Sequence, residues 1–258
     1  MEKIKGQPTG NTNILKPYIW GPLPQGLAYL TQTDQLIIKQ NVKLCEELTK
    51  CDKRIKYEII NSLNQQIYYA KEESSCCMQC LCGPNRGFII HITGNDGQEV
   101  MTLTREFKCC AGCCWCADAC CGFLLRVEAP PGNVVGYCKS SCCVLHMDLM
   151  DTHMQPLFKI WGPCCPVQCL CCPRSISFPV KGINNPEKVH ANIAKIWDGA
   201  IQEVFKEADS FRVTFPLEMD VKQKALIIGA VFLLVCSSVF MTIKYIMFQF
   251  SMNIKYIL

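Results

Sequence analysis

Cysteine is the residue type in this chain with the greatest capacity for chemistry. The 258-residue sequence contains 22 cysteines. Most of them gather in four clusters, at residues 76–82, 109–121, 138–143 and 164–172. The C-x-x-C spacing, which can hold zinc tetrahedrally through thiolates, joins Cys113 to Cys116 and Cys169 to Cys172. Zinc binding at these four cysteines is therefore one hypothesis for the clusters.

The clusters also contain more thiols than a structural zinc site requires, because many of the cysteines are adjacent in sequence. A disulfide framework would be typical of a short secreted chain behind a signal peptide. Residues 1–25 contain no apolar segment of the kind that a signal peptide needs. We therefore expect the cysteines to lie in a reducing, cytoplasmic compartment.

The other residues capable of acid–base or nucleophilic chemistry form no recognisable catalytic motif. None of the four histidines adjoins a nucleophile pattern, and neither G-x-S-x-G nor H-E-x-x-H occurs in the sequence. A phosphate-binding G-x-x-x-x-G-K-[ST] loop does not occur either. The net charge of +4 is spread along the chain without a block of like charges, so nucleic acid is not an expected partner. The sequence therefore predicts a protein that is not an enzyme and does not use ATP.

Short apolar or alternating runs, separated by polar turns, predict a mainly β domain over residues 25–221. The runs FIIHIT and EVMTL, for example, flank residues 95–97, an Asn-Asp-Gly turn that tolerates left-handed backbone. About ten strands of this kind predict an antiparallel meander that closes into a barrel. A stripe of apolar residues predicts one soluble helix over residues 187–206. Residues 1–24, which contain Pro, Gly and Asn without apolar periodicity, are expected to form a short flexible arm.

The longest apolar segment runs from Ala225 to Ile243, through Gly229 and Phe232, without a charged residue. Its length approaches the roughly 20 residues that cross a bilayer as a helix. A central helix buried inside a folded domain would also be apolar on every face. The segment therefore has two interpretations, as a membrane anchor or as a core helix.

Lysines flank this segment, two before it and one after it, where their ammonium groups could reach lipid headgroups. The excess before the segment favours a cytoplasmic N-terminus, which is a single-pass type II topology. On this basis we divide the C-terminal part of the chain into a hydrophobic helix over residues 222–244 and a short tail over residues 245–258.

Several runs of the sequence, in their order and spacing, resemble the phospholipid scramblase family. They are KYEIINSLNQQIYYAKEESSCC, CGPNRGFIIHITGNDGQEVMTL, KCCAGCCWCADACC, VEAPPGNVVGY and FRVTFPLEMDVKQKALIIGAVFL. The resemblance covers about residues 18–235. It implies a tubby-like fold, in which a closed antiparallel β-barrel surrounds a hydrophobic helix near the C-terminus. On that fold the apolar segment is the core of the barrel, so the two interpretations of the segment remain open.

The resemblance also implies covalent palmitate on the second cysteine cluster. The residues concerned are Cys109, Cys110, Cys113, Cys114, Cys116, Cys120 and Cys121. Several acyl chains would hold the domain at a bilayer, since each buried methylene contributes about 0.8 kcal/mol. Palmitoylation is therefore our main hypothesis for this cluster, with zinc binding and unmodified thiols as alternatives.

A calcium site is implied by the resemblance at residues 207–218. This segment is similar to a twelve-residue EF-hand loop, with Glu207, Asp209 and Glu218 at loop positions 1, 3 and 12. Backbone carbonyls of Phe211 and Val213 would add two of the six to eight oxygens that calcium takes. Water or lipid phosphate would supply the rest.

The same segment has a second interpretation as a β-strand. Arg212 stands at the loop position where an EF-hand needs glycine, and its charge would repel the ion. Phe211, Val213 and Phe215 alternate as the inward face of a strand would. In that case the acidic residues are simply solvated.

The resemblance implies ATP-independent movement of phospholipids in both directions between membrane leaflets, with calcium as the trigger. The alternative is a palmitoylated, membrane-tethered interaction module that recruits signalling proteins without transporting lipid. Membrane phospholipids are the expected partners, together with a homo-oligomer and signalling proteins. The expected location is the plasma membrane, with the bulk of the chain in the cytoplasm.

Overall fold

The computed structural model describes residues 25–41, 55–75, 82, 85–108, 122–141, 146–162, 176–196 and 210–236. Its strands are β1 (Gln35–Asn41), β2 (Lys56–Asn61), β3 (Gln66–Glu73), β4 (Phe88–Gly94), β5 (Glu99–Arg105), β6 (Leu124–Glu128), β7 (Val134–Ser140), β8 (Met147–Met150), β9 (Pro156–Ile160), β10 (Ile176–Gly182), β11 (Val189–Ile196) and β12 (Ser210–Thr214). Its helices are the 3-10 helix η1 (Gln25–Leu27), α1 (Ala28–Thr31) and α5 (Val221–Val235).

The twelve strands form one closed antiparallel barrel. Each strand pairs with its neighbours in the chain, and β1 pairs with β12 to close the ring, with Leu36 opposite Val213. Closure removes the edge strands, whose unpaired peptide groups would otherwise bind other chains. The predicted closed antiparallel barrel is confirmed, with two more strands than the turn pattern indicated.

Alternation along the strands divides the barrel wall into an inner and an outer face. On β4, for example, Ile90 and Ile92 are fully buried while Ile89 and His91 are partly exposed. Successive side chains of a strand point to opposite faces, so one apolar residue in two is enough to build the core. The polar residues between them lie on the outer surface.

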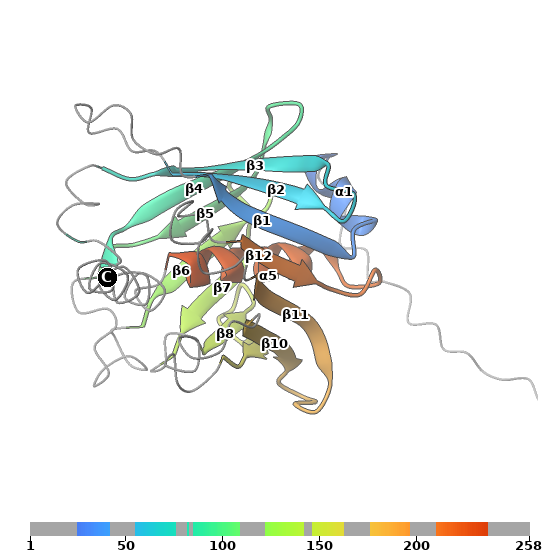
Figure 1. The fold of residues 1–258 in the computed structure, drawn as a ribbon. Helices are drawn as coiled ribbons and strands as arrows, with labels where there is room; N and C mark the ends of the chain where they lie inside the picture. The colour runs from blue at the N-terminus through green and yellow to red at the C-terminus, as the bar shows by residue number, and fades with distance from the viewer. Residues whose placement is uncertain are drawn as a thin grey trace, which may run out of the picture.

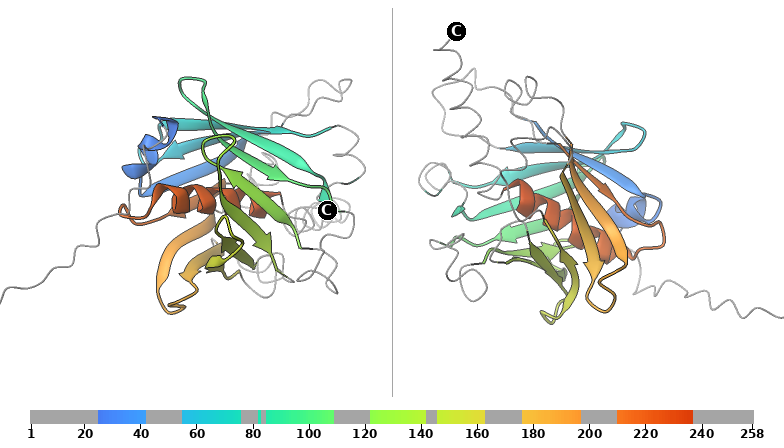
Figure 2. Two further views of the ribbon diagram at one scale, coloured as in Figure 1. Left: turned by 180° about the vertical axis from the view of Figure 1, so that it is seen from behind. Right: turned by 60° about the horizontal axis from the view of Figure 1, so that its bottom comes forward.

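Helix α5 runs through the middle of the barrel, and its apolar residues meet the inner faces of the strands. Figure 1 shows it in red between strands β1–β5 on one side and strands β7, β8, β10 and β11 on the other, and both views of Figure 2 show it enclosed by strands. Every residue from Lys224 to Val235 is buried. At Gly229 an added Cβ would lie 2.6 Å from Cγ2 of Val127, so the helix approaches β6 as closely as a glycine allows. A helix that is apolar on all sides is stable here because strands surround it.

The predicted soluble helix over residues 187–206 is wrong where the structure describes it. Residues 189–196 form strand β11, in which Ala191, Ile193 and Lys195 are buried and alternate with partly exposed residues. β11 pairs with β10 over residues 189–195 and with β12 over residues 192–196. The apolar residues of this segment are spaced in a way that also fits a helix. The neighbouring strands β10 and β12, however, offer backbone hydrogen-bond partners that only an extended chain can use. The rest of the predicted helix lies outside the described residues.

The structure places Ala225, Gly229 and Phe232 inside the barrel, so the core-helix interpretation describes this part of the apolar segment. The single-pass type II topology over residues 222–244 stays a prediction, because the structure describes only residues 222–236 of that segment. Over the described residues, no helix combines the length and the apolarity required to cross a bilayer. Ile243 lies outside the described residues.

Candidate functional site

The barrel has two different ends, because consecutive hairpins of an antiparallel meander alternate between them. One end carries short turns that the structure describes throughout, at residues 62–65, 95–98, 129–133, 151–155 and 183–188, and α5 begins there. We call it the turn end. At the other end, the connector end, the strands are joined by longer segments that are described only at their bases, and α5 ends there.

All four cysteine clusters are connected to the connector end. The described strand ends that flank them belong to the β3–β4, β5–β6, β7–β8 and β9–β10 connections, and all of these lie at this end. At the base of the second cluster, Lys108 Nζ donates a hydrogen bond of 2.9 Å to the carbonyl oxygen of Gly122. The fold therefore brings the described residues that flank the four clusters, far apart in the sequence, to one end of one barrel. The predicted palmitoylation and zinc residues themselves lie outside the described residues.

Cys138 is the exception among the clustered cysteines, because it belongs to a strand. It is fully buried on the inner face of β7, and its Sγ lies 3.4 Å from the carbonyl oxygen of Leu226 on α5. Burial raises the pKa of the Cys138 thiol well above its ordinary value, so this thiol stays protonated and unreactive. Cys138 is a packing residue of the core.

A buried ion pair lies inside the connector end. Arg86, just before β4, donates from Nε and Nη2 to the two carboxylate oxygens of Glu72 on β3, at 2.7 and 2.9 Å. Both side chains are almost completely buried, at 3% and 0% exposure. Burial opposes the charge of Arg86, but the hydrogen bonds to Glu72 and the charge of that carboxylate outweigh burial and raise the pKa of Arg86. Arg86 therefore stays charged, and its two hydrogen bonds to Glu72 hold the pair in one geometry.

A second buried guanidinium lies next to this pair. Arg105, at the end of β5, donates from Nε and Nη2 to the carbonyl oxygen of Arg86, at 3.2 and 2.7 Å. Its Cζ lies 4.3 Å from the ring centre of Phe88 and 4.5 Å from that of Phe123. Burial lowers the pKa of Arg105 to about 10, which leaves it charged at pH 7. The sequence analysis did not predict this cluster of buried charges. The available signal was that charged residues occupy positions where the strand alternation predicts inward-facing side chains.

The C-terminal end of α5 contacts the same region. Sγ of Cys236 lies 3.9 Å from the hydroxyl of Tyr57, whose ring meets that of Phe232 edge-on at 5.1 Å. Burial, together with the charge of Glu72, raises the pKa of the Cys236 thiol to about 11. The helix C-terminus carries a partial negative charge, which the nearby guanidinium groups of Arg86 and Arg105 complement.

At the turn end, a single lysine attaches α5 to the N-terminal segment. Lys224 is fully buried, and its Nζ donates to the carbonyl oxygens of Leu30, Thr33 and Leu217, at 2.9, 2.9 and 3.2 Å. Burial lowers the pKa of Lys224, and the charges of Asp34 and Glu218 oppose this effect. The sequence analysis interpreted this lysine as one that reaches lipid headgroups, but it closes the turn end from inside.

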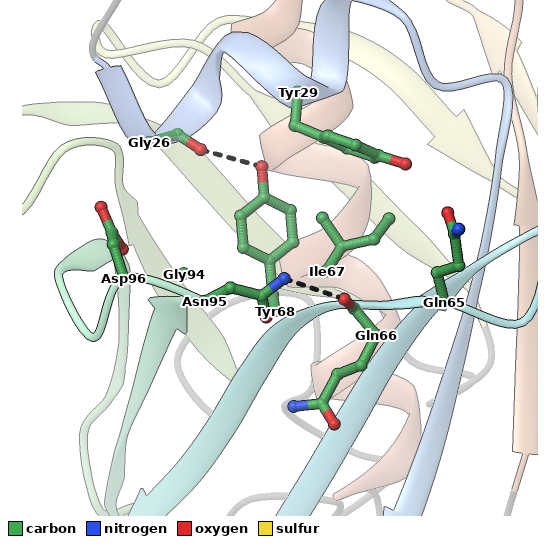
Figure 3. Close-up of a pocket in the computed structure, with 9 residues that line it drawn as sticks. All are labelled: Gly26, Tyr29, Gln65, Gln66, Ile67, Tyr68, Gly94, Asn95 and Asp96. Carbon is green, nitrogen blue, oxygen red and sulfur yellow. Dashed lines mark hydrogen bonds between the residues drawn. The ribbon is translucent and has the colours of Figure 1, made fainter.

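A shallow pocket of about 490 Å³ lies on the outside of the turn end, between η1, α1 and the turns before β3 and β5 (Figure 3). Its lining consists of Gly26, Tyr29, Gln65, Gln66, Ile67, Tyr68, Gly94, Asn95 and Asp96. Tyr68 donates its hydroxyl to the carbonyl oxygen of Gly26, and Asn95 Nδ2 donates to that of Gln66, at 2.9 and 3.0 Å. The lining contains carboxamides, phenols and one carboxylate but no cationic side chain. It therefore does not suit a phosphate headgroup.

The structure describes residues 210–218 of the predicted calcium segment, and calcium binding there stays a prediction. Residues 210–214 are strand β12, and Phe211 and Val213 are fully buried on its inner face. β12 pairs with β1 on one side and β11 on the other, so its peptide groups belong to the sheet. The strand alternative is confirmed for these residues. Glu218 lies at the turn end, whereas Glu207 and Asp209 precede β12 and lie outside the described residues.

An exposed cluster on the outer face responds to pH. His91 on β4 lies between two carboxylates, with Nδ1 2.7 Å from Oε1 of Glu99 and Nε2 3.1 Å from Oε2 of Glu73. Partial burial opposes the charge of the imidazole, but the hydrogen bond and charge of Glu99, followed by those of Glu73, raise the pKa of His91 above 6.5. Among the described residues, no three His, Cys, Asp or Glu side chains are arranged to hold a metal ion.

We expect His91→Asn to flatten the pH dependence of stability near neutrality. Because the pKa of His91 is raised in the folded state, its stabilising effect is complete below about pH 6.5 and is lost as the pH rises through the folded pKa. The measurement is the melting temperature of both proteins across this range. If the melting temperatures of both proteins changed equally with pH, His91 would not be the group that causes this pH dependence.

Comparison with known proteins identifies relatives over most of the chain. A family model described as Scramblase matches residues 16–237. Phospholipid scramblase 2 of Bos taurus is 40% identical over 240 residues, covering 90% of this chain and 78% of the relative. Phospholipid scramblase 1 of Homo sapiens is 40% identical over 224 residues, covering 83% of this chain and 68% of the relative. Phospholipid scramblase family member 5 of Homo sapiens is 39% identical over 213 residues, covering 82% and 76%.

Among solved structures, the X-ray structure of a protein from Arabidopsis thaliana matches with a TM-score of 0.40 at 12% identity. That match covers 76% of this chain and 89% of the other.

Proposed function

Because this chain belongs to the Scramblase family, we propose that it moves phospholipids between the two leaflets of a membrane, in both directions and without ATP. The observation that carries the proposal is the identity of about 40% with phospholipid scramblases over most of the chain. On this proposal the protein performs no covalent chemistry. It lowers the barrier for a polar headgroup to pass through the hydrocarbon layer.

The filled barrel restricts the route that a lipid can take. Leu103, Val127 and Phe232 are fully buried, and Gly229 lets the helix touch the wall. Interiors packed in this way leave no space for a headgroup. We therefore propose that lipids cross beside the barrel, where the protein, as a homo-oligomer, distorts the bilayer.

We propose that palmitate on the Cys109–Cys121 cluster holds the connector end at the cytoplasmic face of the plasma membrane. This proposal is supported by the position of Lys108 and Gly122, which fix the base of that cluster at the connector end. Several acyl chains give near-permanent attachment, since one chain alone binds only marginally. Attachment through acyl chains requires no span within α5.

Calcium is the proposed trigger, and the strand in the middle of residues 207–218 limits where it binds. A strand of five residues spans roughly 15 Å, whereas calcium ligands lie about 2.3–2.6 Å from the ion. One ion therefore cannot bind both Glu218 and the acidic residues before β12. We propose that Glu207 and Asp209 contribute and that Glu218 does not.

We expect Glu218→Gln to leave the calcium dependence of lipid scrambling unchanged. The double variant Glu207→Gln, Asp209→Asn is expected to raise the calcium concentration needed for half-maximal scrambling about tenfold or more, because two anionic ligands are lost. The measurement is a calcium titration of scrambling in vesicles. If Glu218→Gln alone raised the calcium concentration needed for half-maximal scrambling, the proposal that Glu218 does not bind calcium would be contradicted.

The direct test of the proposed function uses the purified full chain in vesicles that carry a fluorescent phospholipid in both leaflets. A membrane-impermeant reductant quenches only the outer leaflet, so scrambling appears as slow loss of the inner-leaflet signal. We expect this loss with protein and not with empty vesicles. If the acylated protein produces no loss with or without calcium, the tethered interaction module with signalling partners replaces transport as the function.

A further inference from the structure

The turn end of the barrel is acidic on its surface. Exposed or half-buried carboxylates around it are Asp34, Asp96, Asp151, Glu187, Glu218 and Asp220. Apart from the buried Lys224, the lysines described at or directly before the turns of this end are Lys181, Lys188 and Lys222. A surface of anionic headgroups would repel this end of the barrel and would favour approach by the other.

Lysines project outward near the connector end from a set of adjacent strands. Lys139 on β7 lies opposite Asp148 on β8, which in turn lies opposite Lys159 on β9. Lys159 Nζ is 3.5 Å from Asp148 Oδ1. Lys108 follows β5, which is joined to this group through β6. Cationic side chains thus occupy the outer face of β5–β9 at the end opposite the acidic turns.

Two large aromatic side chains lie beside these lysines without entering the core. Trp161, just after β9, is 47% exposed, and its ring lies 5.4 Å from Lys159 Nζ and 5.3 Å from the ring of His146. Phe107, just after β5, is 46% exposed. The contacts fix the Trp161 ring at the rim of the barrel, where indole is well suited to the boundary between headgroups and hydrocarbon.

We propose that Phe107, Lys108, Lys139, Lys159 and Trp161 form a face that docks the barrel on a bilayer rich in anionic phospholipids. This membrane face rests on the proposed function, since it gives the barrel its orientation at the membrane where lipids move. The lysines meet the headgroups, and the two aromatic rings enter the interfacial layer. Docking in this way directs the connector end, with its cysteine clusters, towards the lipid and the acidic turn end away from it.

The turn end also exposes apolar side chains. Variants of these residues therefore serve as a control for the proposed orientation of the barrel on the membrane. Leu63 is 74% exposed and Leu217 is 54% exposed, which is more than either aromatic residue of the membrane face. Apolar exposure alone would therefore favour docking through the turn end. Charge favours the opposite end, because Glu218 and Asp220 follow Leu217 closely in the chain, whereas Phe107 lies between one exposed carboxylate, Glu106, and one lysine, Lys108.

The test measures binding of the full chain, produced without acylation, to vesicles of phosphatidylcholine with or without phosphatidylserine. We expect the double variant Phe107→Ser, Trp161→Ser to bind phosphatidylserine vesicles at least about tenfold more weakly. The double variant Lys139→Gln, Lys159→Gln should lose about fivefold per lysine on the same vesicles and nothing on phosphatidylcholine alone. The matched control Leu63→Ser, Leu217→Ser should bind as the unmodified chain does.

Equal binding by the aromatic variant and the unmodified chain would overturn the proposal, as would weakened binding by the turn-end control. The lysine variant keeps the test decisive if serine at position 161 disturbs folding, because Lys139 and Lys159 project from the outer face. Scrambling assays on the same vesicles separate this inference from the proposed function. The predicted binding pattern, together with no scrambling by the acylated chain, would leave the membrane face standing and remove transport.

Discussion

Lys224→Met is expected to destabilise the barrel by about 3–5 kcal/mol, which is among the largest effects of any single substitution in this chain. Methionine has a similar length, so it fills the space but cannot donate to the carbonyl oxygens of Leu30, Thr33 and Leu217. Each buried carbonyl left without its donor costs about 1–3 kcal/mol. For a chain of this size the loss corresponds to a fall in melting temperature of roughly 6–20 °C.

The matched control is Lys222→Met, two residues earlier on the same helix. Lys222 is exposed, so its replacement should change the free energy of unfolding by no more than about 0.5 kcal/mol. Denaturant unfolding followed by circular dichroism measures both variants. If the two substitutions had equal effects, Lys224 would not be the residue that fixes α5 to the turn end.

Removing the carboxylate of Glu72 should be about as damaging at the opposite end of the barrel. In Glu72→Ala, the buried guanidinium of Arg86 loses both of the hydrogen bonds that it makes to this side chain. Breaking a buried ion pair from one side costs about 3–5 kcal/mol, because an uncompensated charge remains in the interior. The nearby Arg105 makes the loss worse, because its charge is repelled by Arg86 and is no longer offset by the charge of Glu72.

Two further variants separate this effect from a general disturbance of β3. Glu73→Ala, at the next position, removes a carboxylate that is 73% exposed and should cost less than about 1 kcal/mol. The double variant Glu72→Met, Arg86→Met should recover part of the stability lost in Glu72→Ala, because no unpaired charge remains. A double variant less stable than Glu72→Ala would show that Arg86 acts mainly through other contacts.

The position of these charges is consistent with the proposed mode of action. Glu72, Arg86 and Arg105 lie inside the end of the barrel that we propose faces the membrane, around the last turn of α5. Their hydrogen bonds join β3, the segment before β4 and the end of β5, next to the connection on which we propose palmitate. Loss of the cluster should therefore reduce stability before it alters lipid specificity.

The sequence alone indicated about ten of the twelve strands, an antiparallel barrel and the apolar C-terminal helix, but it placed a helix where β11 lies. Alternation and turn residues are local properties, and they are enough to identify strands such as β4 and β5 around residues 95–97. The strand interpretation of Phe211 and Val213 was also available from alternation. In contrast, the segment 189–196 has apolar residues at spacings that fit a helix as well as a strand, and only the backbone partners on β10 and β12 decide between them.

Only the tertiary structure decided what surrounds the apolar helix. Hydropathy measures how strongly residues such as Ala225, Gly229 and Phe232 avoid water, but lipid and a ring of strands satisfy that preference equally well. The same applies to the buried charges, because Lys224, Glu72 and Arg86 find their partners on elements far away in the sequence. Such pairings depend on which strand ends share one end of the barrel, and that arrangement exists only after the ring has closed.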